Sequence, residues 1–480
     1  MSYAFPRPQQ DGSFALFLAM MILGYDAHKM MLRVYFLCAV SAVLTACSGA
    51  TNSLGANALP AMRSPARAAA PATGSGSIGN IKHVVIIVQE NHSFDNLFAH
   101  FPGADGASRG KNAEGQWVRL EKSDLYSSEA LDNSHLAFTV DYDGGKMDGF
   151  SAVYVSSKPC PTCAYKYVNP NQIQPYWTMA QQYGLADHMF TSETSGSFNG
   201  HQDLIRGDTE ISSTESLIDF PSHGPWGCDA PPGTTTPVIE SDGYYLQDGP
   251  APCLSYETLR DLLDAKQVSW KYYTPNLLKS LAGSYWDAFD AISAVRNGPE
   301  WKKNISSPQT KIFKDITAGS LADVSWVIPD GVDSDHSGFG STDKGPSWVA
   351  SVVNAIGGSQ YWSSTAIIIV WDDWGGWYDH VPPPQLDYAG LGFRVPMILV
   401  SPYAKQGYVS HTQYEFGSVI KFVEDVWNLG RLGTTDQRAN SIDDMFNFDQ
   451  APRKFSQIDA KYPKSFFERQ KPSNVPVDTN

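Results

Sequence analysis

Acidic and amide side chains follow directly after two strongly apolar stretches of this chain, His83–Val88 and Thr365–Trp371. Adjacent carboxylates at the end of a buried strand are costly unless a cation neutralises them. Carboxylate oxygens together with an amide oxygen suit a hard divalent ion such as Ca²⁺, Mg²⁺ or Mn²⁺. Either acidic set alone could be a helix cap or a solvated strand end, so a metal site requires the two sets to meet. The residues concerned are Glu90, Asn91, Asp372 and Asp373.

A second candidate for chemistry is the segment of residues 191–201, which is dense in hydroxyl groups. If residues 198–206 form a helix, Ser197 lies at its amino end, where free N–H groups and the helix dipole favour an anion. A neighbouring metal ion would lower the pKa of the hydroxyl and make it a nucleophile. Ser195 and Thr194 are alternative nucleophiles in the same segment. Because such segments are usually loops, the hypothesis depends on the metal site beside it.

The elements that would position these groups are apolar strands alternating with amphipathic helices. Three runs, His83–Val88, Thr365–Trp371 and Val395–Val400, are rich in apolar residues and do not alternate in polarity, which is typical of buried parallel strands. This order predicts an α/β sandwich around a mostly parallel sheet, with ligands bound beyond the carboxyl ends of the strands. A weaker strand pattern covers residues 324–328, and helical patterns cover residues 256–265, 347–356 and 419–427.

Composition restricts the class of protein. Of the 480 residues, 42% are hydrophobic and 12% are aromatic, which excludes a disordered or collagen-like chain. The formal charge is 35 − 50 = −15, which argues against a nucleic-acid binder, because such proteins neutralise phosphates with a basic face. We expect one large domain at residues 81–460, with loop insertions at 205–255 and 285–320, followed by a C-terminal tail at 461–480.

The first 47 residues have the features of an export signal. Two apolar runs, Phe14–Leu23 and Val34–Leu44, are each shorter than the roughly 18–20 residues that a membrane-spanning helix needs. The second run ends in Leu-Thr-Ala-Cys, which resembles the lipobox of bacterial lipoproteins, in which the cysteine is acylated. We therefore predict an exported protein that is periplasmic, secreted or bound to the outer membrane through an acylated Cys47. The alternative interpretation of residues 1–47 is an ordinary secretory signal. Residues 48–80 are expected to be a flexible linker.

Four cysteines lie beyond the signal region, an even number that suits an oxidising compartment. Cys160 and Cys163 form a CxxC pair. Such a pair is either a local disulfide or a redox-active or zinc-binding pair. Because the sequence has no second CxxC and no suitably spaced His, we predict the local disulfide. Cys228 and Cys253, with 24 residues between them, are predicted to form a structural disulfide.

Gln-Glu-Asn-His-Ser-Phe-Asp at residues 89–95 resembles the signature of the bacterial phosphoesterase family, which contains phospholipase C-type enzymes and an acid phosphatase. The resemblance covers roughly residues 80–455 and implies an alkaline-phosphatase-like fold. His92 stands where the family commonly has Arg, and the segment around Ser197 lacks the prolines that members often have there. Further matching motifs lie at residues 145–150, 197–202, 270–273, 335–336, 371–383, 392–396 and 401–402.

The resemblance implies a metal-dependent phosphoesterase. Ser197 would attack phosphorus and form a phosphoserine that water then hydrolyses, while the metal ion activates the hydroxyl and stabilises the developing charge. Both a phosphomonoester and a diester such as a phospholipid remain open as substrates. A non-catalytic surface-binding protein on the same scaffold is the competing hypothesis. The implied metal ligands are Glu90, Asn91, Asp372 and Asp373.

The resemblance also implies roles for several histidines. His336 and His135 are implied to bind phosphoryl oxygens or to protonate the leaving oxygen. His380 and His201, together with Asn91, are candidates for substrate binding. For His380 and His201, a structural role beside the site is the alternative interpretation.

Overall fold

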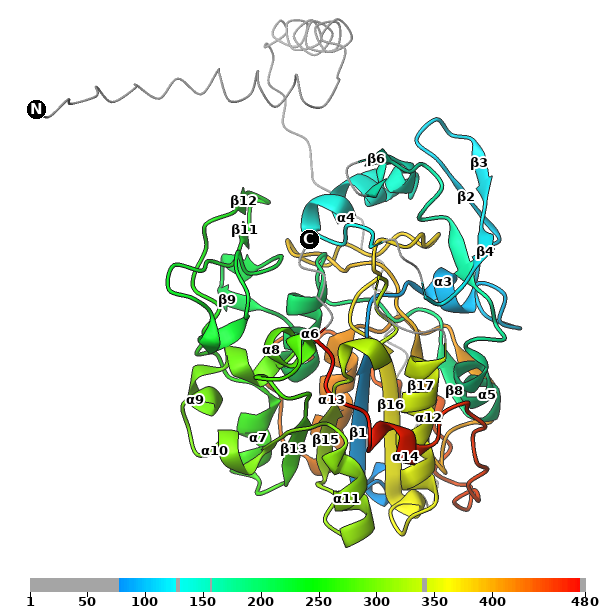
Figure 1. The fold of residues 1–480 in the computed structure, drawn as a ribbon, viewed down its shortest axis with the longest axis vertical. Helices are drawn as coiled ribbons and strands as arrows, with labels where there is room; N and C mark the ends of the chain where they lie inside the picture. The colour runs from blue at the N-terminus through cyan, green and yellow to red at the C-terminus, as the bar shows by residue number, and fades with distance from the viewer. Residues whose placement is uncertain (1–76, 127–129, 156–157, 339–342, 475–480) are drawn as a thin grey trace, which may run out of the picture. The chain divides into compact units, whose positions relative to one another are not determined.

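An eight-stranded sheet forms the centre of the described part of the chain (Figure 1). The structure is a computed structural model that describes residues 77–126, 130–155, 158–338 and 343–474. Neighbouring strands are parallel throughout this sheet, except that β17 runs against both of its neighbours. In spatial order the strands are β14 (Ile305–Ser306), β13 (Trp270–Tyr273), β15 (Val324–Val327), β1 (His83–Gln89), β16 (Thr365–Trp371), β17 (Met397–Val400), β8 (Gly184–Ala186) and β18 (Tyr408–Ser410).

The two central strands, β1 and β16, are buried along almost their whole length. Their Val and Ile side chains fill both faces of the sheet, which is the environment that β-branched residues favour. Gln89 at the end of β1 pairs with Trp371 at the end of β16. The polar residues that follow the two strands therefore start side by side at one edge of the sheet.

The direction of β17 corrects one prediction. The run Val395–Val400 was expected to be a parallel strand, but Met397 pairs with Val370 and Val400 with Ile367, so the strand is antiparallel to β16. A parallel return needs a crossover, usually a helix, and residues 372–396 contain none. Burial predicts a strand without predicting its direction. As a result, Ser401 lies at the opposite edge of the sheet from Asp372.

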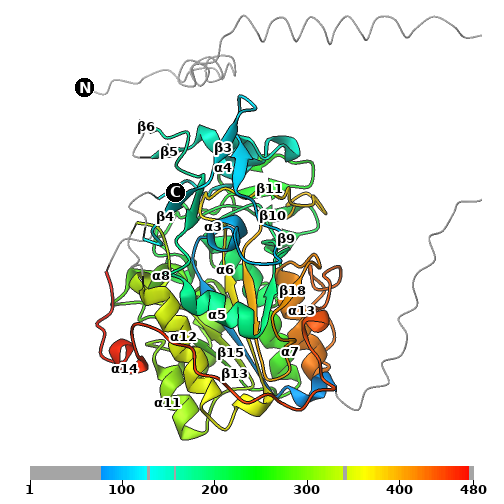
Figure 2. The same ribbon diagram turned by 90° about the vertical axis from the view of Figure 1, so that its right-hand side faces the viewer.

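Helices cover both faces of the sheet, which confirms the predicted α/β sandwich (Figure 2). In α12 (Lys344–Gly357), the buried side chains Val349, Val352, Val353 and Ile356 recur at the spacing of one helical face. One layer contains α5 (Gln174–Gln182), α11 (Lys311–Ala318), α12 (Lys344–Gly357) and α14 (Lys464–Phe467), and the other contains α6 (Ser197–Arg206), α7 (Leu259–Ala265) and α13 (Phe416–Trp427).

Two segments predicted to be loop insertions contain regular elements, which corrects that prediction. Within residues 205–255, β9 (Glu210–Ser212), β10 (Glu215–Leu217), β11 (Val238–Glu240) and β12 (Tyr245–Leu246) form a separate antiparallel sheet. Within residues 285–320, β14 joins the edge of the main sheet and α11 packs on α12. Most of these elements are too short to show a hydrophobic period in the sequence. The 285–320 segment also contains the short helices α9 (Ser293–Arg296) and α10 (Glu300–Lys303), and α8 (Leu281–Tyr285) ends where this segment begins.

Residues 94–168 form a second region, which lies beyond the carboxyl ends of β1 and β16 (Figure 1). Its small core includes Phe138 and Phe150 and is completed by Trp374, Trp377 and Phe393 from the connection between β16 and β17. The connection that follows Asp373 is therefore held between two cores. The elements are α3 (Phe94–Phe98), β2 (Arg109–Lys111), β3 (Trp117–Arg119), β4 (Glu121–Ser123), α4 (His135–Tyr142), β5 (Tyr154–Val155), β6 (Lys158–Pro159) and β7 (Lys166–Val168).

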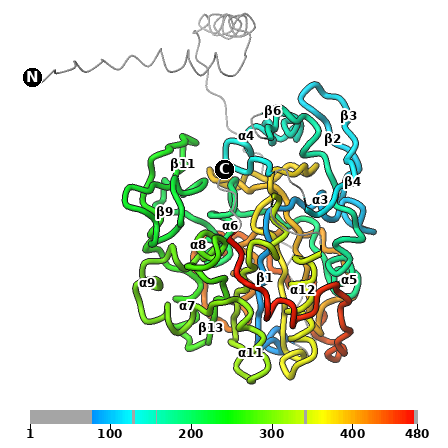
Figure 3. The backbone as a smooth tube through the Cα atoms, viewed as in Figure 1, coloured from blue at the N-terminus to red at the C-terminus, as the bar shows by residue number. Residues whose placement is uncertain are grey.

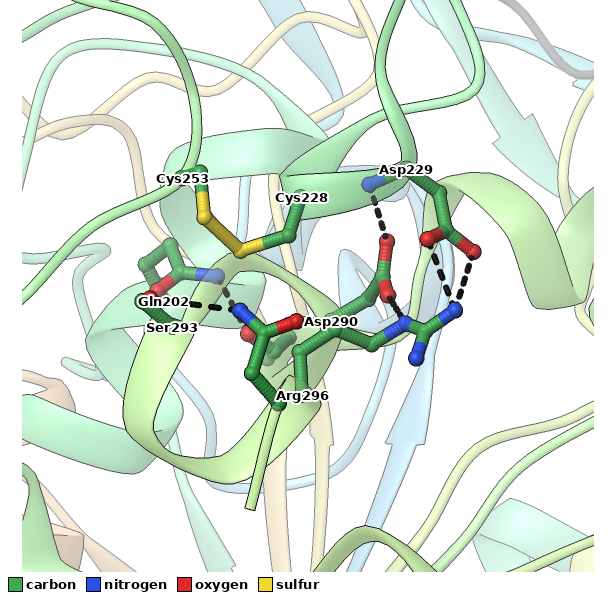
Figure 4. The surroundings of a disulfide bond; sticks show 9 residues. Gln202, Cys228, Asp229, Cys253, Asp290, Ser293 and Arg296 are labelled. Carbon is green, nitrogen blue, oxygen red and sulfur yellow. Dashed lines mark hydrogen bonds and ion pairs between the residues drawn. A yellow bond between two sulfur atoms is a disulfide. The ribbon is translucent and has the colours of Figure 1, made fainter.

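Both predicted disulfides form, Cys160 with Cys163 and Cys228 with Cys253. Beside the second disulfide, the Arg296 guanidinium lies between the carboxylates of Asp229 and Asp290 (Figure 4). The disulfide closes a loop within residues 205–255, and the ion pair between Asp229 and Arg296 joins this insertion to α9.

The C-terminal segment of the described part also packs on the domain. Residues 461–474, part of the predicted tail, contain α14, whose Phe467 ring lies 5.4 Å from that of Trp348 in α12. Figure 3 shows this C-terminal segment, in red, running along α12. The predicted export signal, Cys47 and most of the predicted linker lie outside the described residues. Within the described ranges, no helix is both long and apolar enough to cross a membrane.

The two disulfides close loops of different length, which predicts different effects of removing them. Loop-closure entropy gives a loss of about 3.5 kcal/mol for Cys228→Ala with Cys253→Ala, and about 2 kcal/mol for Cys160→Ala with Cys163→Ala. Urea unfolding of both double variants measures the two free energies. Equal losses, or a larger loss for the short loop, would contradict this ranking.

Candidate metal and nucleophile site

Glu90 and Asp372 lie next to each other where β1 and β16 end, and both are fully buried. The backbone N–H of Asn91 donates a hydrogen bond to Asp372 Oδ1 at 2.9 Å. Asn91 has a φ of 58°, in the left-handed region. Gly375 packs against it so closely that a Cβ there would lie 2.2 Å from the carbonyl oxygen of Asn91. This local geometry turns both chains sharply at the sheet edge and keeps their polar groups together.

His201 completes a group that could hold a metal ion. Its Nε2 lies 2.8 Å from Glu90 Oε1 and 3.8 Å from Asp372 Oδ2, and one ligand atom from each residue falls within 4.8 Å of the others. Glu90 Oε2, Asn91 Oδ1 and Asp372 Oδ2 have no hydrogen-bond partner in the described structure. Buried oxygens of this kind are costly unless a ligand satisfies them. The donor set fits a divalent cation, and the imidazole admits zinc-type metals as well as Ca²⁺, Mg²⁺ and Mn²⁺.

The electrostatics of the group also favour a cation. Burial raises the pKa of Glu90 well above its usual range. Burial and the neighbouring Glu90 carboxylate do the same to the pKa of Asp372. Burial lowers the pKa of His201 to about 4, so the imidazole is neutral at pH 7 and supplies no positive charge. Within the described ranges, no Lys or Arg forms an ion pair with Glu90 or Asp372.

Asp373 faces the predicted nucleophile. The Ser197 hydroxyl donates a hydrogen bond to Asp373 Oδ2 at 3.0 Å. Asn91 Nδ2 donates to the same oxygen at 3.2 Å and to Ser197 Oγ at 3.4 Å. Asn133 Nδ2 lies 2.9 and 3.0 Å from the two oxygens of Asp373. Asp373, predicted as a metal ligand, therefore lies beside Ser197 and outside the group formed by Glu90, Asp372 and His201.

The helix α6 positions both Ser197 and His201, four residues apart on one face. Ser197 is its first residue, as predicted, and Gly196 precedes it as the N-cap. Gly200 lets the helix approach the sheet edge, because a Cβ there would lie 2.4 Å from the backbone oxygen of Asp372. Because α6 lies this close to the sheet, the Ser197 hydroxyl and the His201 imidazole contact the acidic residues.

The alternative nucleophiles point elsewhere. The Ser195 hydroxyl donates to Asn199 Oδ1 at 3.2 Å, and the Thr194 hydroxyl donates to the backbone oxygen of Ala389 at 3.1 Å. In the described structure neither hydroxyl is bonded to Asp373, so the geometry favours Ser197 among the three.

His336 lies close to the site, whereas His135 lies at its margin. The rings of His336 and His201 both stack on Trp286, with ring centroids 5.9 and 6.3 Å away. Burial lowers the pKa of His336 to about 4, so its ring is neutral at pH 7. The half-buried His135 has its Nδ1 2.9 Å from the Thr194 hydroxyl and stacks on Tyr245.

His380 belongs to a separate group with Asp95 and Asp379. Arg394 is fully buried among them, and its Nε donates to Asp379 Oδ1 at 2.8 Å. His380 Nδ1 lies 2.7 Å from Asp95 Oδ2. Burial lowers the pKa of His380, but the hydrogen bond to Asp95 and the charges of Asp95 and Asp379 outweigh it and raise the pKa to about 8. The guanidinium already supplies the positive charge, so this group does not fit a metal ion. The structure does not bring His380 to Ser197.

Sequence patterns did not identify Asn133 as a site residue or His201 as a potential metal ligand. Asn133 belongs to none of the recognised motifs, and only the fold places it on Asp373. For His201 a signal existed, because a His four residues after Ser197 shares its helical face.

The raised pKa values of Glu90 and Asp372 predict how a bound ion affects stability. A carboxyl whose pKa is higher in the folded than in the unfolded chain stabilises the fold at a pH below its unfolded pKa. The unfolded pKa is near 4.5 for Glu90 and 3.8 for Asp372. The stabilising contribution is lost as the pH rises through the pKa of the folded state. Metal-free protein should therefore lose stability with rising pH. Added Mn²⁺ should raise the thermal unfolding midpoint more at about pH 8 than at about pH 5.

Differential scanning calorimetry with EDTA or Mn²⁺ measures this shift. Asp372→Asn should remove most of the Mn²⁺ effect, whereas His380→Gln, in the group that does not fit a metal, should keep it. A Mn²⁺ effect that is the same at both pH values, or unchanged in Asp372→Asn, would show that these carboxylates do not bind the ion.

The known proteins that resemble this chain include several named as phospholipases C. Phospholipase C B of Mycobacterium tuberculosis is 23% identical over 439 residues, which cover 78% of this chain and 80% of that protein. Non-specific phospholipase C3 of Arabidopsis thaliana is 23% identical over 439 residues, covering 78% and 75%. Hemolytic phospholipase C of Pseudomonas aeruginosa is 24% identical over 411 residues, covering 75% of this chain but 54% of that longer protein.

Among solved structures, a protein in the alkaline phosphatase superfamily from Vibrio parahaemolyticus is similar over 77% of this chain and 73% of its own. Its sequence identity is 10% and the TM-score is 0.36, too low to carry a functional argument. The model of the Phosphoesterase family matches residues 81–430, most of the chain. The chain therefore belongs to the phosphoesterase family and is a phosphoester hydrolase.

Proposed function

We propose that this protein hydrolyses phosphoric esters with Ser197 as nucleophile and a divalent metal ion as cofactor. The observation that carries the proposal is the position of the Ser197 hydroxyl, at the amino end of α6 and 3.0 Å from Asp373. The group of Glu90, Asp372 and His201 supplies the ligands beside it. A surface-binding protein without catalysis would not need a nucleophile held against buried carboxylates at this cost.

In the proposed reaction, the proton of the Ser197 hydroxyl passes to Asp373 as Oγ forms a bond to phosphorus, while the bond from phosphorus to the ester oxygen breaks and that oxygen leaves once it is protonated. Asp373 holds the hydroxyl by accepting its hydrogen bond, and the free N–H groups at the start of α6 favour the anionic phosphoryl group. A bound divalent ion would lower the pKa of the hydroxyl and draw charge from a phosphoryl oxygen. Water then hydrolyses the phosphoserine and restores the enzyme.

The predicted roles of the other residues form part of the proposal. Asn91, whose Nδ2 reaches Ser197 Oγ, is placed to contact the phosphoryl group as well as to offer Oδ1 to the metal ion. The Nδ1–H of His336 donates to the backbone oxygen of Ser337, so His336 would take up a second proton at Nε2 before it protonates the leaving oxygen. His135, at the margin, would contact the outer part of the substrate. His380 would act by holding the connection after Asp373 through its carboxylate partners.

A phospholipid is the substrate class that the relatives favour, since the named proteins are phospholipases C. A soluble phosphomonoester remains the competing substrate, because attack by serine on phosphorus serves both. The disulfides fit an exported protein, and attachment through an acylated Cys47 would hold the enzyme at a membrane.

Replacement of the nucleophile tests the proposal. Ser197→Ala should lower kcat by about 10³-fold or more, because no other described hydroxyl is bonded to Asp373. Ser195→Ala is the matched control: its hydroxyl bonds to Asn199, and its removal should leave most of the activity. Release of nitrophenol from a chromogenic phosphomonoester and of phosphocholine from phosphatidylcholine measures both substrate classes. Full activity of Ser197→Ala on both would rule out Ser197.

A further inference from the structure

The two-stranded ribbon β2–β3 has one face directed outward. Lys111 pairs with Trp117 and Arg109 with Arg119, and residues directly opposite in an antiparallel pair share a face. The alternate pair, Gly110 with Val118, forms the inner face. Three cationic residues and one tryptophan therefore make up the whole outer face, and all four are exposed.

These charges are not neutralised by the protein itself. In the part of the chain that the structure describes, Arg109, Lys111 and Arg119 form no ion pair. The Arg109 guanidinium lies 4.4 Å from the centroid of the Trp117 ring, and Lys111 Nζ lies 5.5 Å from it. Trp117 is nevertheless 57% exposed. An unpaired basic face is unexpected on a chain with a formal charge of −15.

The inner face fixes the ribbon to the region of the proposed site. A Cβ at Gly110 would lie 2.3 Å from the Tyr378 ring, so only glycine allows this contact. Tyr378 belongs to the connection that begins with Asp372 and Asp373. The Tyr165 hydroxyl also donates to the backbone oxygen of Lys111 at 2.7 Å. The ribbon is thus held on the same side of the sheet as the carboxyl ends of β1 and β16 (Figure 1).

We propose that the outer face of β2–β3 docks this protein on an anionic lipid surface. Unpaired Arg and Lys are attracted to the negative potential of anionic headgroups, within about a Debye length. A Trp ring with an apolar body and one N–H donor suits the boundary between headgroups and acyl chains. This inference deepens the proposed function and rests on it, because docking serves an enzyme whose substrate is a phospholipid. Docking would bring the site to ester bonds in the same lipid surface.

Vesicle binding tests the proposal directly. The full chain carrying Cys47→Ser and Ser197→Ala is sedimented with phosphatidylcholine vesicles that contain or lack phosphatidylglycerol, so that neither acylation nor hydrolysis contributes. Adding Arg109→Gln, Lys111→Gln and Arg119→Gln should lower partitioning onto the anionic vesicles on the order of 100-fold. Each charge contributes about 1 kcal/mol near such a surface, and about 1.4 kcal/mol corresponds to a tenfold change. Trp117→Ala should weaken binding to these vesicles as well.

A matched control removes three exposed charges elsewhere. Lys302→Gln, Lys303→Gln and Lys314→Gln, on α10 and α11, produce the same change in net charge away from the ribbon and should leave binding unchanged (Figure 1). Equal losses in the two triple variants, or wild-type binding by the ribbon variant, would overturn the proposal. Loss of heparin or single-stranded DNA binding in the ribbon variant, with vesicle binding intact, would also overturn it in favour of a different polyanion.

Turnover of a soluble phosphomonoester separates this proposal from the proposed function. With Ser197 present, the ribbon variants should hydrolyse the soluble ester at the parent rate, since Trp117 and its neighbours are exposed and do not bond to the site. A protein that binds vesicles through the ribbon but hydrolyses no ester would contradict the proposed function and leave the docking inference intact. A parent protein that hydrolyses the ester but does not bind anionic vesicles would do the reverse.

Discussion

Three carboxylates, those of Glu90, Asp372 and Asp373, are buried together at the carboxyl ends of β1 and β16, and their mutual repulsion is the constraint on which the arrangement around them depends. Asp373 is relieved by donors from Ser197, Asn91 and Asn133. Glu90 and Asp372 retain oxygens without donors in the described structure, and their histidine neighbour is neutral. Asp373 is thus a carboxylate bonded to the Ser197 hydroxyl, whereas Glu90 and Asp372 keep oxygens that could bind a cation.

The packing around the carboxylates follows from the need to bring several segments to one point. Gly200 allows α6 to lie against the backbone of Asp372, and Gly375 allows the connection after β16 to lie against Asn91. A short distance away, Arg394 neutralises Asp95 and Asp379 with a charge from the chain itself. Buried carboxylates are therefore compensated in two ways. The guanidinium of Arg394 neutralises Asp95 and Asp379, and in our proposal a bound metal ion neutralises Glu90 and Asp372.

The sequence predicted the parts of this arrangement that depend on local pattern. The β-branched runs identified β1 and β16, and the parallel geometry then placed Glu90 beside Asp372. The direction of β17 was not predictable from its apolar residues, because burial is the same for either direction. Asn133 and Trp286 reach the site from segments without a recognisable period, so their positions depend on the tertiary fold alone. The hydroxyl-rich segment before a predicted helix and the family resemblance both indicated Ser197, and the structure adds its bond to Asp373.

The position of the metal ion is the central claim, and an anomalous difference map measures it directly. Crystals of the protein soaked in Mn²⁺ and recorded at the manganese absorption edge should show their strongest peak between Glu90, Asp372 and His201, beside the Ser197 hydroxyl. A strongest peak between Asp95, Asp379 and His380, or no peak at the ends of β1 and β16, would contradict the account.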